Sequence, residues 1–157
     1  MDMLVKDIMK KDVVSVKRST TLKELINLLK NFHTIPLVPV VDDDNGLIGM
    51  VSFHNLIDIF LPYEVSILKT IPFLEREEID IFELEITPEM GILVLVDDLM
   101  DTKILTVNEE EPLEKVYNLM KKHSIDKLPV VNQDQKLLGM IGDFDILAAV
   151  FRQKGIK

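Results

Sequence analysis

Residues 128–147 indicate the fold most clearly, and they read LPVVNQDQKLLGMIGDFDIL. Two short aliphatic runs flank the polar gap 132–136, and acidic residues stand where a helix would begin, which predicts a strand, a turn, a strand and a helix. Residues 38–57 read VPVVDDDNGLIGMVSFHNLI and match this stretch position for position at a constant offset of 90. The chain therefore contains an internal repeat.

The repeat extends toward the N-terminus of each copy. Residues 5–9 (VKDIM) align with residues 96–100 (VDDLM), and Val16 aligns with Val107, at an offset of 91. One extra residue near His33 in the first copy explains the change of offset. A repeated unit usually needs its copy to bury its apolar face, so we expect the two copies to pack together.

Each copy is expected to contain a short strand followed by an amphipathic helix. Residues 13–16 have the composition of a strand, and Thr21 with Glu24 forms a capping box that would start the first helix. Pro112 suits the first position of the corresponding helix in the second copy. The apolar residues that recur at helical spacing are Leu22, Leu25, Ile26, Leu29 and Phe32 in one helix and Leu113, Val116, Tyr117 and Met120 in the other.

The two predicted hairpins differ in their turns. Asn45-Gly46 is a strong signal for a tight turn, whereas residues 132–136 (NQDQK) contain no glycine and predict a looser loop. The three aspartates at 42–44 lack the alternating spacing and the final glutamate of a calcium loop. We therefore expect a solvated turn there.

Length and composition indicate one compact, soluble unit. The chain has 157 residues, 47% of them hydrophobic, and a chain of this length can bury most of its unfolded surface. It contains no cysteine, which excludes a disulfide scaffold, a zinc–thiolate site and a cysteine nucleophile and fits a reducing compartment. No apolar run is long enough for a signal peptide or a membrane span. We expect a cytoplasmic protein without membrane association.

The net charge of −9 is concentrated between the two copies. Residues 61–96 hold eight acids against Lys69 and Arg76, which accounts for −6 of this charge. Because a polyanion without basic clusters repels phosphate, we expect no binding of nucleic acid.

The insert at 61–92 is acidic, partly apolar and punctuated by prolines. Its content of large apolar side chains distinguishes it from a flexible linker, and residues 92–96 suggest a strand or an extended lead into the second copy. Two interpretations stay open: the insert packs over its own module, or it docks a partner. Its residues that could pack are Ile67, Leu68, Ile71, Phe73 and Leu74.

The sequence contains no recognisable catalytic motif. His33 and His123 end corresponding helices and His54 falls in a first helical turn, so no pair has metal-ligand spacing. The chain has neither a Gly-x-x-x-x-Gly-Lys phosphate loop nor a His-Glu-x-x-His helix. We therefore expect no metal site and no enzymatic activity.

The order of these motifs resembles a known family. Ile-Met, a short strand, a helix, Pro-Val-Val, a polar turn, Gly-Met-hydrophobic-(Ser/Gly) and a final helix occur twice, as in a tandem pair of cystathionine-β-synthase (CBS) domains, or Bateman module. The resemblance places the first repeat at 2–60, the insert at 61–92, the second repeat at 93–152 and a tail at 153–157. It implies an α/β fold of two β-α-β-β-α repeats, each with a short three-stranded sheet and two helices, packed sheet to sheet about a pseudo-twofold.

The resemblance also implies ligand sites in the cleft between the repeats. In the family, a Gly-hydrophobic-hydrophobic-(Ser/Thr)-x-x-(Asp/Asn) segment lets the hydroxyl contact phosphate while the acid or amide accepts the ribose hydroxyls. The logic is physical, because a helix N-terminus attracts anions and a carboxylate can accept two vicinal hydroxyls. The matching residues are Gly49, Ser52 and Asn55 in the first repeat and Gly139, Gly142 and Asp145 in the second. Asp143, beside Gly142, is a further candidate ligand-binding residue.

Each copy departs from this motif. Asn55 is a neutral, weaker acceptor, and Gly142 supplies no hydroxyl, which leaves only backbone and helix dipole for phosphate. Lys127 stands where the family often has a basic group near phosphate, and the first repeat has Leu37 there, so the second site is favoured. A structural alternative stays open, because Ser52 and Asp143 are also ordinary N-cap residues, and Asp145 would favour the helix dipole without any ligand.

The resemblance predicts a regulatory module. It would bind AMP, ADP, ATP or S-adenosylmethionine, require no cofactor, and signal to a separate effector protein. We expect Asp145 to matter for binding and hardly for folding. A homodimer is expected from the apolar residues Phe144, Leu147, Ala148 and Phe151 on one helix. The rival hypothesis is an interaction module with degenerate, empty nucleotide sites, and an enzyme comes third.

Overall fold

The computed structural model describes residues 3–32, 37–62 and 80–157. The chain divides into two compact units. Unit 1 comprises Met1–Ser15, Val41–Gly49 and Thr102–Lys157, and unit 2 comprises Val16–Val40 and Met50–Asp101. The units differ from the sequence repeats, because the N-terminal segment joins the second repeat and the segment leading into the second repeat joins the first.

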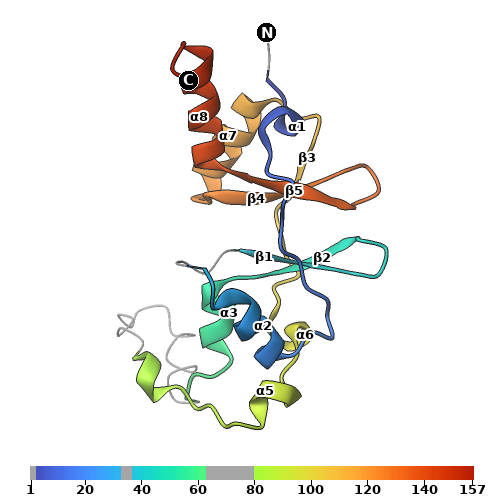
Figure 1. Cartoon of the computed structure of the whole chain (residues 1–157), viewed down its shortest axis with the longest axis vertical. Coiled ribbons are helices and arrows are strands. Elements are labelled where there is room, and N and C mark those ends of the chain that lie inside the picture. The colour runs from blue at the N-terminus through green and yellow to red at the C-terminus, as the bar shows by residue number, and fades with distance from the viewer. Residues whose placement is uncertain (1–2, 33–36, 63–79) are drawn as a thin grey trace. The chain divides into compact units, whose positions relative to one another are not determined.

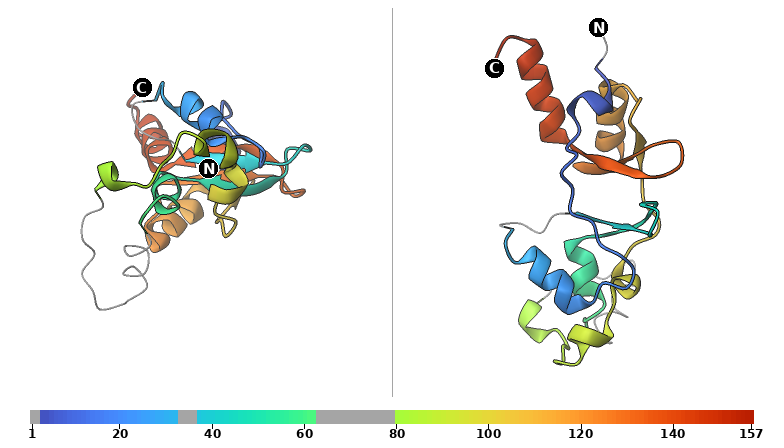
Figure 2. Two further views of the ribbon diagram at one scale, coloured as in Figure 1. Left: turned by 90° about the horizontal axis from the view of Figure 1, so that it is seen from below. Right: turned by 45° about the vertical axis from the view of Figure 1, so that its right-hand side comes forward.

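Unit 1 is built on a three-stranded sheet in the order β3-β4-β5. Strand β3 (Val107–Asn108) is parallel to β4 (Lys127–Val131), which is antiparallel to β5 (Leu137–Gly142). Helices α7 (Leu113–His123) and α8 (Asp143–Gln153) lie together on one face of the sheet (Figure 1, Figure 2). Burial alternates along β5, as expected for a sheet with one face covered by helices.

The core of unit 1 includes a residue from the start of the chain. Val5, in the short helix α1 (Val5–Ile8), is fully buried in this core. The N–H groups of Val5 and Lys6 donate to the carbonyls of Glu111 and Glu109, each at 2.9 Å. The other buried core residues are Val107, Leu113, Val116, Met120, Leu128, Val130, Ile141, Ile146 and Ala149. Removing the N-terminal segment would therefore open the core of the second repeat.

Unit 2 holds the helices of the first repeat and the end of the insert. The strands β1 (Val38–Val41) and β2 (Leu47–Val51) form a two-stranded sheet, of which residues 41–49 belong to unit 1 and the rest to unit 2. Helix α5 lies against α2, where a Cβ on Gly91 would stand 3.6 Å from the Cβ of Lys23. The helices are α2 (Leu22–Leu29), α3 (Phe53–Asp58), the 3-10 helix η1 (Ile81–Glu83), α5 (Met90–Leu93) and α6 (Val96–Leu99).

Helix α2 begins with the capping box that the sequence predicts. Glu24 N–H donates to Thr21 Oγ1 at 3.1 Å, and Thr21 N–H donates to Glu24 Oε1 at 3.4 Å. The prediction of one buried face needs correction at its edge, because Ile26 is 48% exposed and Phe32 lies beyond the helix end and is 43% exposed. The buried residues of this face are Leu22, Leu25 and Leu29.

The strand predicted at residues 13–16 is reduced to a single bridge. Val16 pairs in parallel with Val40, and its N–H donates to the Pro39 carbonyl at 3.0 Å. The first repeat therefore has two strands and one bridging residue where three strands were predicted.

Of the two forms suggested for residues 92–96, the strand is wrong, and the extended lead into the second copy is limited to Val94 and Leu95. Helix α5 ends at Leu93 and helix α6 begins at Val96, and between them Leu95 makes only an isolated bridge with Thr21. A short apolar run has no clear periodicity, so sequence alone does not separate a strand from a buried helical turn. Helix α5, which includes the first residues of this run, is in contact with α2.

The turn without glycine is as tight as the turn with one, so the looser loop predicted at 132–136 is wrong. Asn132 Oδ1 accepts hydrogen bonds from the N–H groups of Asp134 and Lys136 at 2.9 and 3.0 Å. Gln135 adopts the left-handed φ of 62°, which a glycine or asparagine takes more readily. The asparagine side chain organises this turn in place of a glycine.

The first hairpin turn has the same construction. Asp42 Oδ1 accepts hydrogen bonds from the N–H groups of Asp44 and Gly46 at 2.9 and 2.7 Å, and Asn45 has a φ of 63°. The aspartates thus form the predicted turn. In the part of the chain that the structure describes, no group of three or more acidic, histidine or cysteine side chains could hold a metal ion.

Two small sheets with their helices confirm the predicted α/β class. His54 and His123 lie in the first turn of α3 and the last turn of α7, as expected. His33 and the insert residues 67–74 lie outside the described residues. Within 3–32, 37–62 and 80–157, no helix is long and apolar enough to cross a bilayer. The sheet-to-sheet packing of the repeats stays a prediction.

Candidate ligand site

The candidate site lies in unit 1, where β5 runs into α8. Gly142 is the N-cap residue in extended conformation, and its N–H donates to Asp145 Oδ2 at 2.8 Å. The Asp143 N–H donates to the Asp126 carbonyl at 2.9 Å. The alternative that Asp143 itself is the N-cap is wrong, because the helix starts one residue earlier than that role requires. The hydrogen bond from the N-cap residue thus fixes the Asp145 carboxylate at the start of α8.

The predicted basic residue lies directly across from Gly142. Lys127 and Gly142 are opposite each other in the β4–β5 ladder. A Cβ on Gly142 would stand 3.5 Å from both Asp126 O and Asp145 Oδ2 and 3.7 Å from Lys127 Cγ, which are ordinary contact distances. The missing hydroxyl at this position is therefore not imposed by lack of space. Three of the predicted residues, Gly142, Lys127 and Asp145, are brought together.

Sequence reasoning missed Lys10, which joins this site from the start of the chain. Lys10 N–H donates to the Met140 carbonyl at 2.8 Å, and Met140 N–H donates to the Lys10 carbonyl at 2.9 Å. A Cβ on Gly139 would overlap the Lys10 carbonyl oxygen, so this close approach requires glycine. Gly139, proposed above as part of the ligand motif, thus has a structural role.

The Lys10 side chain contacts the predicted ribose acceptor. Its Nζ lies 3.8 Å from Asp145 Oδ1, and the Lys10 side chain is 74% exposed whereas the Asp145 side chain is 16% exposed. A mostly exposed partner contributes little to stability, but it places a positive charge beside a carboxylate that is largely shielded from water. No local signal in the sequence could have identified Lys10, because it reaches the site through the pairing of its segment with β5.

Two of the corresponding residues of the first repeat, Ser52 and Asn55, lie in unit 2 and hydrogen-bond to each other. Ser52 is the N-cap of α3, as the structural alternative predicted, and its N–H donates to Asn55 Oδ1 at 2.7 Å. The Ser52 hydroxyl also contacts Asn55, with Oγ 2.9 Å from Oδ1. In this arrangement the hydroxyl and the amide oxygen are engaged in the cap. Gly49 belongs to unit 1 and is buried.

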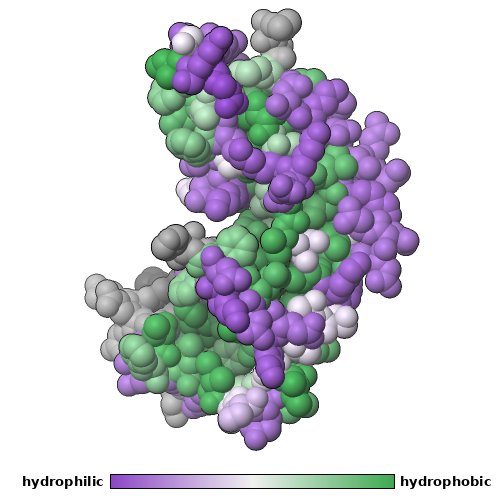
Figure 3. Space-filling model, viewed as in Figure 1, coloured by the Kyte–Doolittle hydropathy of each residue, from purple (hydrophilic) through white to green (hydrophobic). Residues whose placement is uncertain are grey.

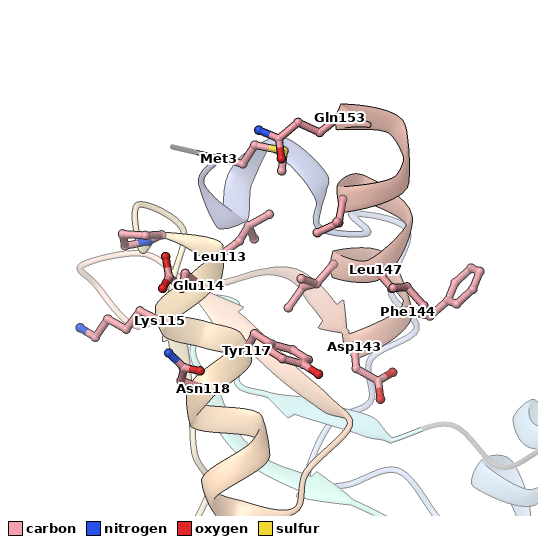
Figure 4. Close-up of a pocket in the computed structure, with 13 residues that line it drawn as sticks. Met3, Leu113, Glu114, Lys115, Tyr117, Asn118, Asp143, Phe144, Leu147 and Gln153 are labelled. Atoms are coloured by element: carbon pink, nitrogen blue, oxygen red, sulfur yellow. The ribbon is translucent and has the colours of Figure 1, made fainter. Parts of the chain in front are cut away.

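A groove between α7 and α8 is a second feature that the sequence did not predict. It has a volume of about 1190 Å³, and Figure 4 shows Met3 and Gln153 at one end and Asp143 at the other. Tyr117 extends from α7 toward the first turn of α8, while the Phe144 ring points away from α7 (Figure 4). Three of the four residues of α8 predicted to be exposed are exposed: Phe144 by 72%, Leu147 by 46% and Phe151 by 46%. The fourth, Ala148, is only partly exposed.

Comparison with known families decides the identity of the repeats. The CBS domain model matches residues 5–62 and 96–152, which together are most of the chain. The chain belongs to the CBS domain family. The two matches confirm the tandem CBS repeat, with bounds a few residues from those predicted.

Among its relatives, this CBS-domain chain is 26% identical to the uncharacterized protein MJ1426 of Methanocaldococcus jannaschii, over 94% of this chain and 91% of the relative. Its fold is similar to that of CBSX2 of Arabidopsis thaliana, solved in complex with AMP, with a TM-score of 0.69 and 24% identity over 96% of this chain and 98% of the other. The CBS domain pair of protein MJ0100, solved with 5′-methylthioadenosine and S-adenosyl-L-methionine, gives 0.64 and 21% over 98% and 99%. At these identities the two structures support the fold alone.

Proposed function

We propose that this CBS-domain protein is a regulatory module that binds an adenine nucleotide or a related adenosyl compound where β5 meets α8. The observation that carries the proposal is the convergence of Lys127, Gly142, Asp145 and Lys10, which come from three separate parts of the sequence. CBSX2 and the MJ0100 domain pair were solved with adenosyl ligands, which supports the same ligand class here.

Each group has a role in this proposal. Asp145 Oδ2 holds the Gly142 N–H, so Oδ1 is the oxygen that accepts ribose hydroxyls. Lys127 lies beside Gly142, and together with the N-terminal dipole of the eleven-residue helix α8 it attracts the phosphate. Binding orders these side chains, and the resulting change in shape or association signals to a separate effector protein.

A thermal-shift panel tests the proposal. The purified chain is melted with AMP, ADP, ATP, S-adenosylmethionine and NAD, each with and without Mg²⁺. A ligand present at a hundred times its dissociation constant adds about 2.7 kcal/mol of stability, a shift of several degrees for a chain of this size. If none of these compounds raises the melting temperature, the ligand-sensing proposal fails.

A docking module is the second candidate, and the apolar surface favours it. The α7–α8 groove is lined by Met3, Leu113, Ile146, Leu147 and Val150 among others, and apolar surface is also visible over α3 in unit 2 (Figure 3). Patches of this kind mark interaction sites when they are contiguous. In this candidate the Ser52–Asn55 cap and the Gly142–Asp145 cap are structural and the nucleotide sites stay empty.

We further propose that the protein is a homodimer that buries the exposed apolar residues of α8. Light scattering at micromolar concentration should give twice the mass of 18.0 kDa. Leu147→Asp should lower this mass, because burying an unpaired carboxylate in an interface is energetically unfavourable. A monomer mass for the wild type would refute the dimer without affecting the ligand proposal.

A further inference from the structure

Lys10 and Asp101 occupy equivalent places in the two units. In unit 1 the Lys10 backbone pairs with Met140 through two hydrogen bonds of 2.8 and 2.9 Å. In unit 2 the Asp101 backbone pairs with Met50 through two bonds of the same lengths. Both methionines follow the motif glycine in the last strand of their repeat. In each unit the strand that leads into the junction therefore pairs with one residue from the N-terminal segment of the other repeat.

The residue that pairs with the methionine is positively charged in unit 1 (Lys10) and negatively charged in unit 2 (Asp101). Unit 1 combines the positive Lys10 and Lys127 with the negative Asp145. The equivalent residues of unit 2 are Asp101, the neutral Leu37 and the neutral Asn55. At this one position unit 1 therefore has a cation where unit 2 has an anion, although unit 1 also has the acids Asp126 and Asp143 next to the junction.

We infer that Lys10 determines the ligand class of the unit 1 site, making it select adenosine that carries a 5′-phosphate over neutral or cationic adenosyl compounds. The inference rests on the proposed function of the same junction. A carboxylate that binds the 2′- and 3′-hydroxyls of ribose also repels the phosphate on C5′ of the same sugar, and at 16% exposure Asp145 is poorly screened by water. Lys10 offsets that repulsion because its Nζ lies 3.8 Å from the carboxylate.

The backbone geometry keeps Lys10 in this place. Its N–H and carbonyl are both bonded to Met140, two residues before the N-cap of α8. The missing Cβ of Gly139 lets the Lys10 carbonyl approach the strand. Lys11, the next residue, is exposed and carries the same charge, and the structure records no contact between it and Asp145. The chain thus offers a matched control one residue away.

The experiment compares two probes that share the adenosine group. AMP is anionic, and 5′-methylthioadenosine is neutral, so the ratio of their dissociation constants isolates the contribution of the phosphate. We would titrate the full chain, Lys10→Asp, Lys10→Gln and Lys11→Asp with both probes by calorimetry, and verify by melting that each variant is folded. Lys10→Asp and Lys11→Asp change the net charge by the same amount, so any long-range effect is equal in both.

We expect Lys10→Asp to weaken AMP binding about tenfold or more and Lys10→Gln to weaken it less, with 5′-methylthioadenosine changed by less than about twofold in both. Lys11→Asp should leave the ratio of the two constants unchanged. Equal effects of Lys10→Asp and Lys11→Asp would overturn the inference, as would an unchanged ratio in both Lys10 variants. If the wild type binds neither probe, the proposed function itself fails, which is a different result from binding that is indifferent to Lys10.

Discussion

Asp145 is expected to support both folding and ligand binding, and two substitutions separate these roles. Asp145→Ala removes the acceptor of the Gly142 N–H, a bond of 2.8 Å to a charged group in a partly buried place. Loss of such a bond costs about 1.5 kcal/mol, and loss of the favourable charge at the helix N-terminus adds about 0.3–1 kcal/mol. The 3.8 Å pair with the exposed Lys10 adds little. The earlier expectation of a nearly neutral effect on folding is therefore revised.

Asp145→Asn is the matched variant. Its amide oxygen can still accept the Gly142 N–H, as Asn55 does for Ser52 at 2.7 Å, so most of the cap is retained. A neutral amide is a weaker acceptor for two ribose hydroxyls, and binding should fall by about tenfold. We expect Asp145→Ala to lose both stability and binding, and Asp145→Asn to lose mainly binding.

Urea denaturation measures the folding effect, and calorimetry with the best ligand of the panel measures the binding effect. A loss of about 2 kcal/mol corresponds to a fall of about 4–8 °C in melting temperature for a chain of this size. If Asp145→Ala unfolds at the same urea concentration as the wild type, the capping argument is refuted. If ligand affinity survives in both variants but disappears in Asn55→Ala, the working site is the Ser52 junction of the first repeat.

Three further predictions concern neighbouring features. Gly142→Ser should raise affinity for phosphorylated ligands by restoring a hydroxyl, because its Cβ meets only ordinary contacts at 3.5–3.7 Å; titration with AMP tests this, and weaker binding would show that the space is needed by the ligand. Gln135→Gly should stabilise the chain by about 0.5–1 kcal/mol by relieving the positive φ of 62°. Gln133→Gly, an exposed turn residue for which no positive φ is recorded, is the control in urea melts, and equal effects of the two would contradict this explanation. The hydrogen bond from Lys6 to Glu110 raises the pKa of Lys6. The stability that this pair contributes is therefore complete below the ordinary lysine pKa and is lost as the pH rises through the raised pKa. Lys6→Met should make unfolding less dependent on pH in that alkaline range, and an unchanged dependence would argue against this pair.

The sequence by itself determined the repeat, the α/β class and the family. Matching residues at a constant offset reveal duplication without any knowledge of contacts, and the Thr21–Glu24 capping box is local, so its geometry follows from spacing along the helix. The same kind of local reasoning placed Asp145 in the first turn of a helix, although the N-cap is Gly142 and not the Asp143 that the sequence suggested.

Only the tertiary structure decided which segments complete each unit. Lys10 reaches Asp145 because the N-terminal segment pairs with β5. No local pattern specifies the pairing of Lys10 with Met140, 130 residues further along the chain. Residues 92–96 are too few to show a period, so sequence alone did not reveal that α5 ends and α6 begins within them. The tight turn at 132–136 is different, because it is organised locally by the Asn132 side chain, and the prediction missed it by looking for a glycine. Local hydrogen-bonding patterns can be read from spacing, whereas contacts between distant segments arise from the packing of the whole unit.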